Sequence, residues 1–251
     1  MLNIHTRLDL RSIISFKMKN ISIIIPIFNE SESIFKLIDE IFSEYKKKPP
    51  EVIIVNDGST DDFANKVHTI KKKVCIYSHK SNLGKCRAML TGIKKAKNEL
   101  VCVIDGDGQN PPYEIKKLIS TLKNIESKYK NKFLICGNRK YRQDDFKKKI
   151  SSRVANSIRK FILNDDCIDT ACALKVFSKS NYLSIDYFKN MHRFLPALFK
   201  SKGCKIFNVP IEDRPRTAGK SKYNFNNRFW VGIIDLIKVW KLIKKENKNG
   251  K

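Results

Sequence analysis

A short apolar run followed by apolar residues at helical spacing occurs four times in the first 125 residues of the chain. Each run is rich in aliphatic residues and too short for a helix, which is typical of a buried strand in a parallel sheet. The four runs are Ile21–Pro26, Glu51–Val55, Val74–Tyr77 and Leu100–Ile104. Strands and helices that alternate in this order predict an α/β fold, with a mostly parallel sheet and helices on both faces.

Polar turns follow three of these strands directly. They are Phe28–Glu30, Asp57–Asp61 and Asp105–Asp107. In open sheets of this kind, ligands bind beyond the carboxyl ends of the strands. A single acidic turn is often only a solvated loop, but three such turns at one edge of a sheet predict a ligand site.

The turn after the fourth strand carries two carboxylates one residue apart. Asp105 and Asp107 can face one point, and they repel each other unless a cation lies between them. Mg²⁺ or Mn²⁺ suits this pair, because hard divalent ions take one or two carboxylates and complete their shell with substrate phosphates. Gly106 and Gly108 permit the close approach and unusual backbone angles that such a turn requires.

Two helix predictions depend on individual positions. Ser59 or Thr60 is expected to cap a helix that runs through Val67. Residues 146–163 are predicted to form a helix with an apolar and a basic face, and the basic face is either solvated or directed at a phosphate or a membrane. The apolar face comprises Ile150, Val154, Ile158, Phe161 and Ile162.

The net charge of +26 raises the question of nucleic-acid binding. Only 11 of the 51 basic residues are Arg, whose planar fork suits phosphates better than Lys, and no helix-turn-helix, RNP-like or zinc-finger pattern occurs. An anionic lipid surface or substrate explains the charge without nucleic acid. The seven Cys residues include no Cys-x-x-Cys pair, which indicates free thiols in a reducing compartment.

The two ends of the chain differ from its middle. Residues 1–20 lack a continuous apolar segment and are interpreted as an N-terminal extension. Residues 224–251 combine an amphipathic helix, which carries two Trp and flanking Lys, with a polar tail. This pattern is typical of a helix in a membrane interface, although packing on the core or on a second subunit is the alternative. No apolar run reaches the roughly 18 residues of a membrane-spanning helix.

Six motifs in a fixed order carry a resemblance to a known family. They are Ile25-Pro26-Ile27-Phe28-Asn29-Glu30, Asn56-Asp57-Gly58-Ser59-Thr60-Asp61, Asn82-Leu83-Gly84, Asp105-Gly106-Asp107-Gly108-Gln109, Gly137-Asn138-Arg139 and Arg216-x-x-Gly-x-Ser-Lys-Tyr223. Together they resemble family 2 glycosyltransferases over about residues 21–223. They are most similar to the polyprenyl-phosphate branch, which includes dolichol-phosphate mannosyltransferases.

The resemblance implies a GT-A fold over residues 21–223 and a GDP- or UDP-linked sugar as the donor. It implies donor contacts from Pro26, Phe28, Glu30, Asn56, Asp57 and Asp105, and a metal held by Asp105 and Asp107. Catalytic roles are expected for Asp107, Gln109, Arg139 and Asp169. Basic and polar side chains are expected to hold the acceptor phosphate. They are His192, Arg193, Arg214, Arg216, Lys220, Ser221 and Lys222, with a purely structural role as the alternative for His192.

Two departures from the family pattern bear on these roles. Asn56 stands where the second turn usually carries Asp, so altered donor contacts are expected. Ala173 replaces a Gly in the segment that begins at Asp169.

The segment Asn190–Arg193 stands where relatives that glycosylate a hydroxyl commonly carry a Glu-Asp pair. A phosphate monoester has a second pKa near ~6 and is largely dianionic at neutral pH, so it needs no strong base. The sequence thus predicts inverting transfer of a sugar to a polyprenyl phosphate at the cytoplasmic membrane face, for cell-envelope glycan assembly. A saccharide hydroxyl is the alternative acceptor. A basic nucleic-acid binder leaves the acidic turns unexplained, and a homo-oligomer stays open.

Overall fold

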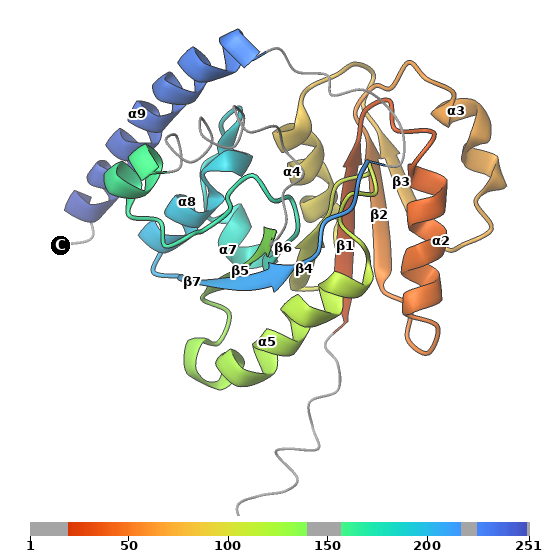
Figure 1. Ribbon diagram of the computed structural model, residues 1–251, viewed down its shortest axis with the longest axis horizontal. Helices are drawn as coiled ribbons and strands as arrows, with labels where there is room; N and C mark the ends of the chain where they lie inside the picture. Colours follow the sequence, from red (N-terminus) through yellow and green to blue (C-terminus); the bar gives the residue numbers. More distant parts are fainter. Residues whose placement is uncertain (1–19, 140–156, 217–224, 250–251) are drawn as a thin grey trace, which may run out of the picture.

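The structure, a computed structural model, describes residues 20–139, 157–216 and 225–249. Within these ranges seven strands form one sheet in the order β3-β2-β1-β4-β6-β5-β7 (Figure 1). Their bounds are β1 Ile21–Ile27, β2 Glu51–Asn56, β3 Cys75–Ser78, β4 Leu100–Val103, β5 Phe133–Arg139, β6 Lys175–Ser178 and β7 Lys205–Ile211. The four strands expected from the apolar runs are all present, and the predicted mostly parallel sheet is confirmed.

Strand β6 is the exception to the parallel arrangement. It pairs antiparallel with both β4 and β5, while β5 pairs parallel with β7. Because β6 runs backwards, the segment that precedes it arrives at the edge of the sheet where the other strands end. Residues 164–174 therefore reach the same edge as the turns after β1, β2 and β4.

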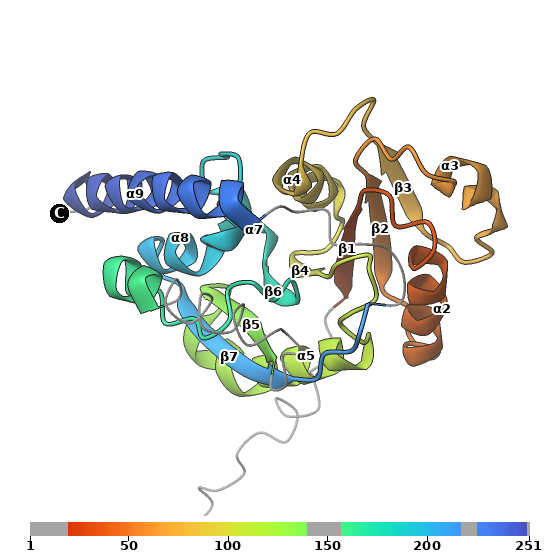
Figure 2. The same ribbon diagram turned by 45° about the horizontal axis from the view of Figure 1, so that its top comes forward.

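Helices cover both faces of the sheet, as predicted. On one face lie α2 (Ile34–Glu44) and α5 (Tyr113–Tyr129), and on the other lie α4 (Lys85–Lys95), α7 (Lys179–Leu183), α8 (Leu195–Ser201) and α9 (Phe225–Asn249). Figure 2 shows α4 and α8 on the opposite side of the sheet from α5. Side chains of β1 alternate between the two cores, since Ile24 packs toward α4 while Ile23 and Ile25 pack toward α2.

The predicted cap of the helix after β2 is wrong. The helix α3 spans only Phe63–Lys66, a 3₁₀ turn (Val67–Thr69) follows it, and the residue before it is Asp62, which makes no capping hydrogen bond. The Ser59 hydroxyl instead accepts from the backbone N–H of Asn29 at 2.9 Å. The Thr60 backbone N–H donates to the Asn29 side chain at 2.7 Å. The two polar turns thus bind each other, because cross-turn partners compete with local capping.

Of the long helix predicted over residues 146–163, the structure describes residues 157–163, which are helical. Residues 140–156 lie outside the described residues. The predicted C-terminal helix is α9, which contacts α8 and buries Leu236 and Val239 in the core. Across the described ranges, no helix is both long enough and apolar enough to cross a bilayer.

Candidate active site

A pocket of about 180 Å³ lies at the carboxyl ends of β1, β2 and β4. Its lining includes five of the six predicted donor contacts, namely Pro26, Phe28, Glu30, Asp57 and Asp105, together with Asp107, Lys85 and Arg216. Asn56 is not part of the lining. Its side-chain oxygen accepts from the Ser59 backbone N–H at 2.9 Å and so shapes the turn.

Asp57 is held by the protein on several sides. Its carboxylate accepts from the backbone N–H groups of Leu83 at 3.0 Å and Gly84 at 2.8 Å, and it lies 2.7 Å from Nδ1 of His79. The side chain is almost fully buried. Charged hydrogen bonds of this kind are strong, so Asp57 fixes the loop that leads into α4.

Gly58, the next residue, adopts a φ of +70°, and a Cβ there would lie 2.5 Å from backbone atoms of the loop before α4. Only glycine fits this close approach without strain. The turn after β2 therefore packs directly against the backbone of the loop that leads into α4.

The carboxylate pair is compensated by two cations. Asp105 lies 2.5 Å from Nζ of Lys85, and Asp107 lies 2.9 Å from the guanidinium of Arg216. Burial, and then the charge of Asp105, raises the pKa of Asp107. The Asp107 side chain also accepts from the backbone N–H of Gln109 at 3.0 Å, which fixes its orientation.

These residues fit a divalent cation that completes its shell with phosphate oxygens. Asp107 is nearly buried, and both burial and the charge of Asp105 disfavour its charged form. A cation bound between the two carboxylates would stabilise that charged form. Among the described residues, no cluster of three or more acidic, His or Cys side chains could hold a metal without a substrate. A Mg²⁺-type site needs no such cluster, because one or two carboxylates and substrate phosphates suffice.

A second cleft of about 390 Å³ adjoins the pocket and shares Lys85, Asp105, Asp107 and Arg216 with it. Its further polar lining comprises Gln109, Asn110, Arg139, Thr170, Lys175, His192, Arg193 and Asp213. Five of the lining residues are Lys or Arg and three are Asp, so the cleft has a positive balance.

Arg139 and Asp169 form a bidentate ion pair beside this cleft. The Arg139 guanidinium donates to the two Asp169 oxygens at 2.7 and 3.1 Å, and it lies 3.8 Å from Asp213. Burial opposes the charge on Arg139, but the hydrogen bonds and charge of Asp169 raise its pKa overall. Both Asp169 oxygens are thus occupied by a permanent cation, which makes this carboxylate a poor proton acceptor.

His192 is positioned by a thiol. Its Nδ1 lies 2.9 Å from Sγ of Cys86 on α4, and its backbone N–H donates to the same sulfur at 3.3 Å. Burial raises the pKa of Cys86, which keeps the sulfur protonated at neutral pH. The neighbouring Arg193 lines the cleft and pairs with no carboxylate among the described residues.

The predicted acceptor-phosphate residues between positions 214 and 222 fall into three groups. Arg216 borders both cavities. Arg214 borders neither, because its guanidinium donates to Glu40 at 2.6 and 3.2 Å and its Nε donates to the Gly108 carbonyl. Lys220, Ser221 and Lys222 lie outside the described residues. The roles of all these side chains stay predictions.

Two Lys side chains of the cleft, Lys175 and Lys85, were not among the predicted site residues. Lys175 is buried and donates to the carbonyls of Thr170 and Cys172, which orders the loop before β6. Lys85 follows the Asn82–Gly84 motif, and its position after a glycine at the start of a helix was the available clue.

A mostly parallel sheet with a carboxylate pair at its carboxyl edge, next to two adjoining cavities, agrees with the GT-A nucleotide-sugar transferase fold that the sequence motifs imply. The family model of glycosyl transferase family 2 matches residues 22–184, and the chain belongs to this family. The predicted family and fold class are therefore confirmed.

The curated relatives agree with this membership, and solved structures share the fold. The dodecaprenyl-phosphate galacturonate synthase of Rhizobium johnstonii is 31% identical over 239 residues, covering 92% of this chain and 69% of that protein. The undecaprenyl-phosphate 4-deoxy-4-formamido-L-arabinose transferase of Pectobacterium carotovorum is 27% identical over 214 residues, covering 83% and 64%. The chain thus spans about two thirds of these relatives.

The glucosyl-3-phosphoglycerate synthase of Mycobacterium tuberculosis, solved with Mn²⁺, UDP and glucosyl-3-phosphoglycerate, shares the fold. Its TM-score is 0.67 at 16% identity, covering 90% of this chain and 80% of that one. The same enzyme solved with Mg²⁺ and UDP gives 0.68 at 15% identity, covering 90% and 79%.

Proposed function

We propose that this protein transfers a sugar from a nucleoside-diphosphate sugar to a polyprenyl phosphate at the cytoplasmic face of a membrane, with inversion at the anomeric carbon. The observation that carries the proposal is the cationic cleft beside the carboxylate pair. Five Lys and Arg side chains border it, and its shared residues join it to the nucleotide pocket. Such a cleft suits an acceptor that is itself a phosphate. The two named relatives act on polyprenyl phosphates, which supports the same acceptor class.

In the proposed reaction an oxygen of the acceptor phosphate forms a bond to the anomeric carbon as the bond from that carbon to the nucleoside diphosphate breaks. The leaving diphosphate takes the bonding electrons, and no proton has to be removed from a dianionic phosphate. Lys85 and Arg216 lie where negative charge would build on the diphosphate. Arg193, Arg139 and His192 lie along the cleft that would receive the acceptor.

Asp105 and Asp107 would hold Mg²⁺ or Mn²⁺. When bound, the ion supplies positive charge that stabilises the departing diphosphate. With such an ion at the two carboxylates, Arg216 and Lys85, which contact them in this structure, would pair with phosphate oxygens. The structural neighbours solved with Mn²⁺ or Mg²⁺ and UDP support this donor and metal chemistry.

Attachment to the membrane surface is proposed through α9. Ile234, Ile237 and Trp240 are 65, 47 and 37% exposed, and exposed Lys238, Lys241 and Lys244 lie among them. An amphipathic helix with aromatic and Lys side chains suits an anionic bilayer interface. The division into residues 1–20, 21–223 and 224–251 stays a prediction.

The test is transfer of radiolabelled sugar from GDP- and UDP-linked donors to undecaprenyl phosphate, with and without Mn²⁺. We expect metal-dependent formation of a labelled lipid that resists mild base and is cleaved by mild acid. Labelling of a polysaccharide alone would favour a hydroxyl acceptor and would contradict the proposal. Arg193→Gln is expected to raise the acceptor KM, because no carboxylate within residues 20–139, 157–216 and 225–249 pairs with this side chain.

A further inference from the structure

The helix of residues 157–163 exposes its apolar side chains and buries its Arg. Ile158, Phe161 and Ile162 are 48, 91 and 37% exposed, whereas Arg159 is only 6% exposed. Positions three and four apart lie on one helix face, so these three apolar side chains form a continuous outward stripe. A soluble surface helix normally shows the reverse arrangement, and an exposed apolar patch of this kind marks an interaction surface.

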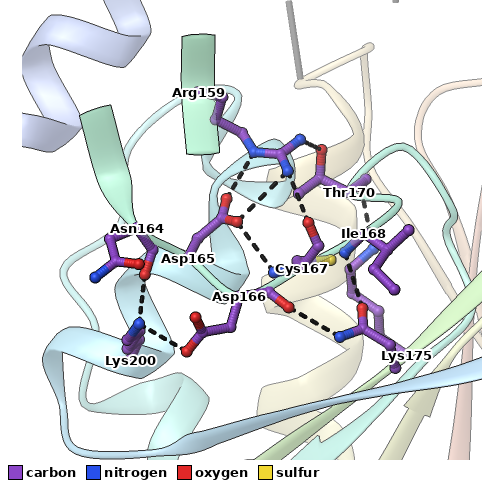
Figure 3. A network of polar contacts seen from close by, with 10 residues as sticks. Arg159, Asn164, Asp165, Asp166, Cys167, Ile168, Thr170, Lys175 and Lys200 are labelled. Atoms are coloured by element: carbon purple, nitrogen blue, oxygen red, sulfur yellow. Dashed lines mark hydrogen bonds and ion pairs between the residues drawn. The ribbon is translucent and has the colours of Figure 1, made fainter. Parts of the chain in front are cut away.

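The inverted orientation is fixed by a buried polar network (Figure 3). The Arg159 guanidinium lies 2.6 Å from Asp165, which is fully buried, and donates to the Cys167 carbonyl at 2.9 Å and the Thr170 hydroxyl at 2.5 Å. The loss of a partner from a buried ion pair is strongly destabilising. The outward position of Phe161 therefore follows from the fold and not from a frayed helix end.

The loop that follows the helix makes polar contacts with α8 and β7. Lys200 of α8 pairs with Asp166 at 2.6 Å and donates to the Asn164 carbonyl at 2.6 Å. Asn208 of β7 accepts from the Ile168 backbone N–H at 2.9 Å and donates to the Asp166 carbonyl at 2.8 Å. Ile168 of this loop is a further apolar side chain that is 49% exposed.

This surface lies close to the acceptor cleft along the chain. Thr170, which receives a hydrogen bond from Arg159, lines the cleft, and its neighbour Asp169 holds Arg139. A ligand that contacts Phe161 would therefore sit on the element that leads directly into the acceptor side of the site.

The charges around the stripe favour an anionic lipid surface as its occupant. No acidic residue occurs in 157–163, Lys160 is exposed, and the nearby Asp166 is neutralised by Lys200. Figures 1 and 2 both place this helix (green) at the end of the molecule that carries α8 and α9. The apolar face of α9, with its Lys residues, thus lies at the same end.

We propose that Ile158, Phe161, Ile162 and Ile168 form a second membrane-docking surface, which inserts into the interfacial region of an anionic bilayer and acts together with α9. Only the purpose of this docking rests on the proposed function, because it would bring the acceptor side of the cleft to the lipid. Whether the surface binds lipid can be measured without donor or acceptor.

The test is co-sedimentation of the full chain with phosphatidylcholine vesicles, with and without phosphatidylglycerol. Complete burial of a Phe side chain changes a partition constant by roughly ten- to one-hundredfold. Phe161→Ser should therefore weaken binding to the anionic vesicles about tenfold or more. Leu183→Ser is the matched control, because Leu183 is 39% exposed on α7, outside the surface. Circular dichroism should show both variants folded, since both side chains protrude.

Unchanged vesicle binding by Phe161→Ser would overturn the proposal. The same holds if the variant changes the mass measured by analytical ultracentrifugation while vesicle binding stays as in the wild type, because the stripe would then join two copies of the chain. Transfer to a water-soluble, short-chain prenyl phosphate should be unaffected by Phe161→Ser. If the wild type binds vesicles through Phe161 but transfers no sugar to that acceptor, the proposed function fails and the docking surface stands.

Discussion

Replacement of Asp107 by Asn should stabilise the metal-free protein slightly while it removes transfer activity. The carboxylate is nearly buried beside Asp105, and both effects raise its pKa, so its charged form destabilises the folded state. Replacement of a destabilising charged group by a neutral one should raise the free energy of unfolding by about 0.5–2 kcal/mol. The substitution also removes the ion pair with Arg216, whose side chain is 29% exposed, and this loss reduces the gain by roughly 0–1 kcal/mol. A gain of about 1 kcal/mol raises the Tm by roughly 2–4 °C for a chain of this size.

The pH dependence of this gain has a definite sign. Because the folded-state pKa of Asp107 is raised, its contribution to stability is fully present below the unfolded pKa and is lost as the pH rises through the raised folded-state pKa. The gain of Asp107→Asn over the wild type should therefore be absent below pH 3.8, the ordinary pKa of the group, and grow as the pH rises from there through the raised pKa. Thermal unfolding followed by circular dichroism across this pH range measures it.

Addition of Mn²⁺ and UDP should reverse the order of the two proteins. A ligand at one hundred times its Kd stabilises the folded state by about 2.7 kcal/mol, and Asp107→Asn should lose most of this effect. Asp166→Asn is the control, since it removes the same charge from an exposed pair with Lys200. If metal-free Asp107→Asn were less stable than the wild type by more than about 1 kcal/mol, or kept the full Mn²⁺ effect, the assignment of Asp107 as a destabilised metal ligand would be refuted.

Three further substitutions test the site. Asp169→Asn should lower transfer by less than about tenfold and leave the pH profile unchanged, because Arg139 occupies both carboxylate oxygens; a general base would cost roughly 10²–10⁴-fold. Cys86→Ala should raise the acceptor KM about two- to tenfold at constant kcat, the worth of one hydrogen bond to His192, and Cys86→Ser should restore it. Gly58→Ala should destabilise the fold by about 2 kcal/mol or more in urea unfolding, because its φ is +70° and its Cβ would lie 2.5 Å from backbone.

The first four strands of the sheet were predictable from the sequence because each is a dense aliphatic run, and three of them are followed directly by a polar turn. The reversed direction of β6 was not, since its short segment Lys175–Ser178 begins with a buried Lys. The cap of α3 was also mispredicted. Ser59 and Thr60 have capping side chains, but their partner is Asn29, about 30 residues away in the chain. Local rules describe which hydrogen bonds a residue can make, and tertiary contacts decide which of them form.

The helix of residues 157–163 shows the limit of periodicity. The pattern of Ile158, Phe161 and Ile162 correctly predicted one apolar face but not the direction in which it points. An apolar stripe normally turns inward because burial removes it from water. Here Asp165, the Cys167 carbonyl and Thr170 provide enough acceptors to bury Arg159, and the stripe turns outward. No feature of the helix sequence alone contains that information.

Asp57 connects the two halves of the site through one helix terminus. Its carboxylate accepts from the two backbone N–H groups just before α4, and the first two residues of α4 then contact different groups of the site. Lys85 reaches Asp105 on the metal side, while Cys86 orients His192 on the acceptor side. Displacement of this terminus would therefore disturb donor and acceptor groups together. Position 57 needs a carboxylate, because its two oxygens accept from two backbone N–H groups and contact the His79 ring at the same time. Position 56 needs only one acceptor oxygen for its turn, which the Asn56 amide supplies. The substitution of Asp by Asn at the first position of this motif is thereby compatible with an intact site.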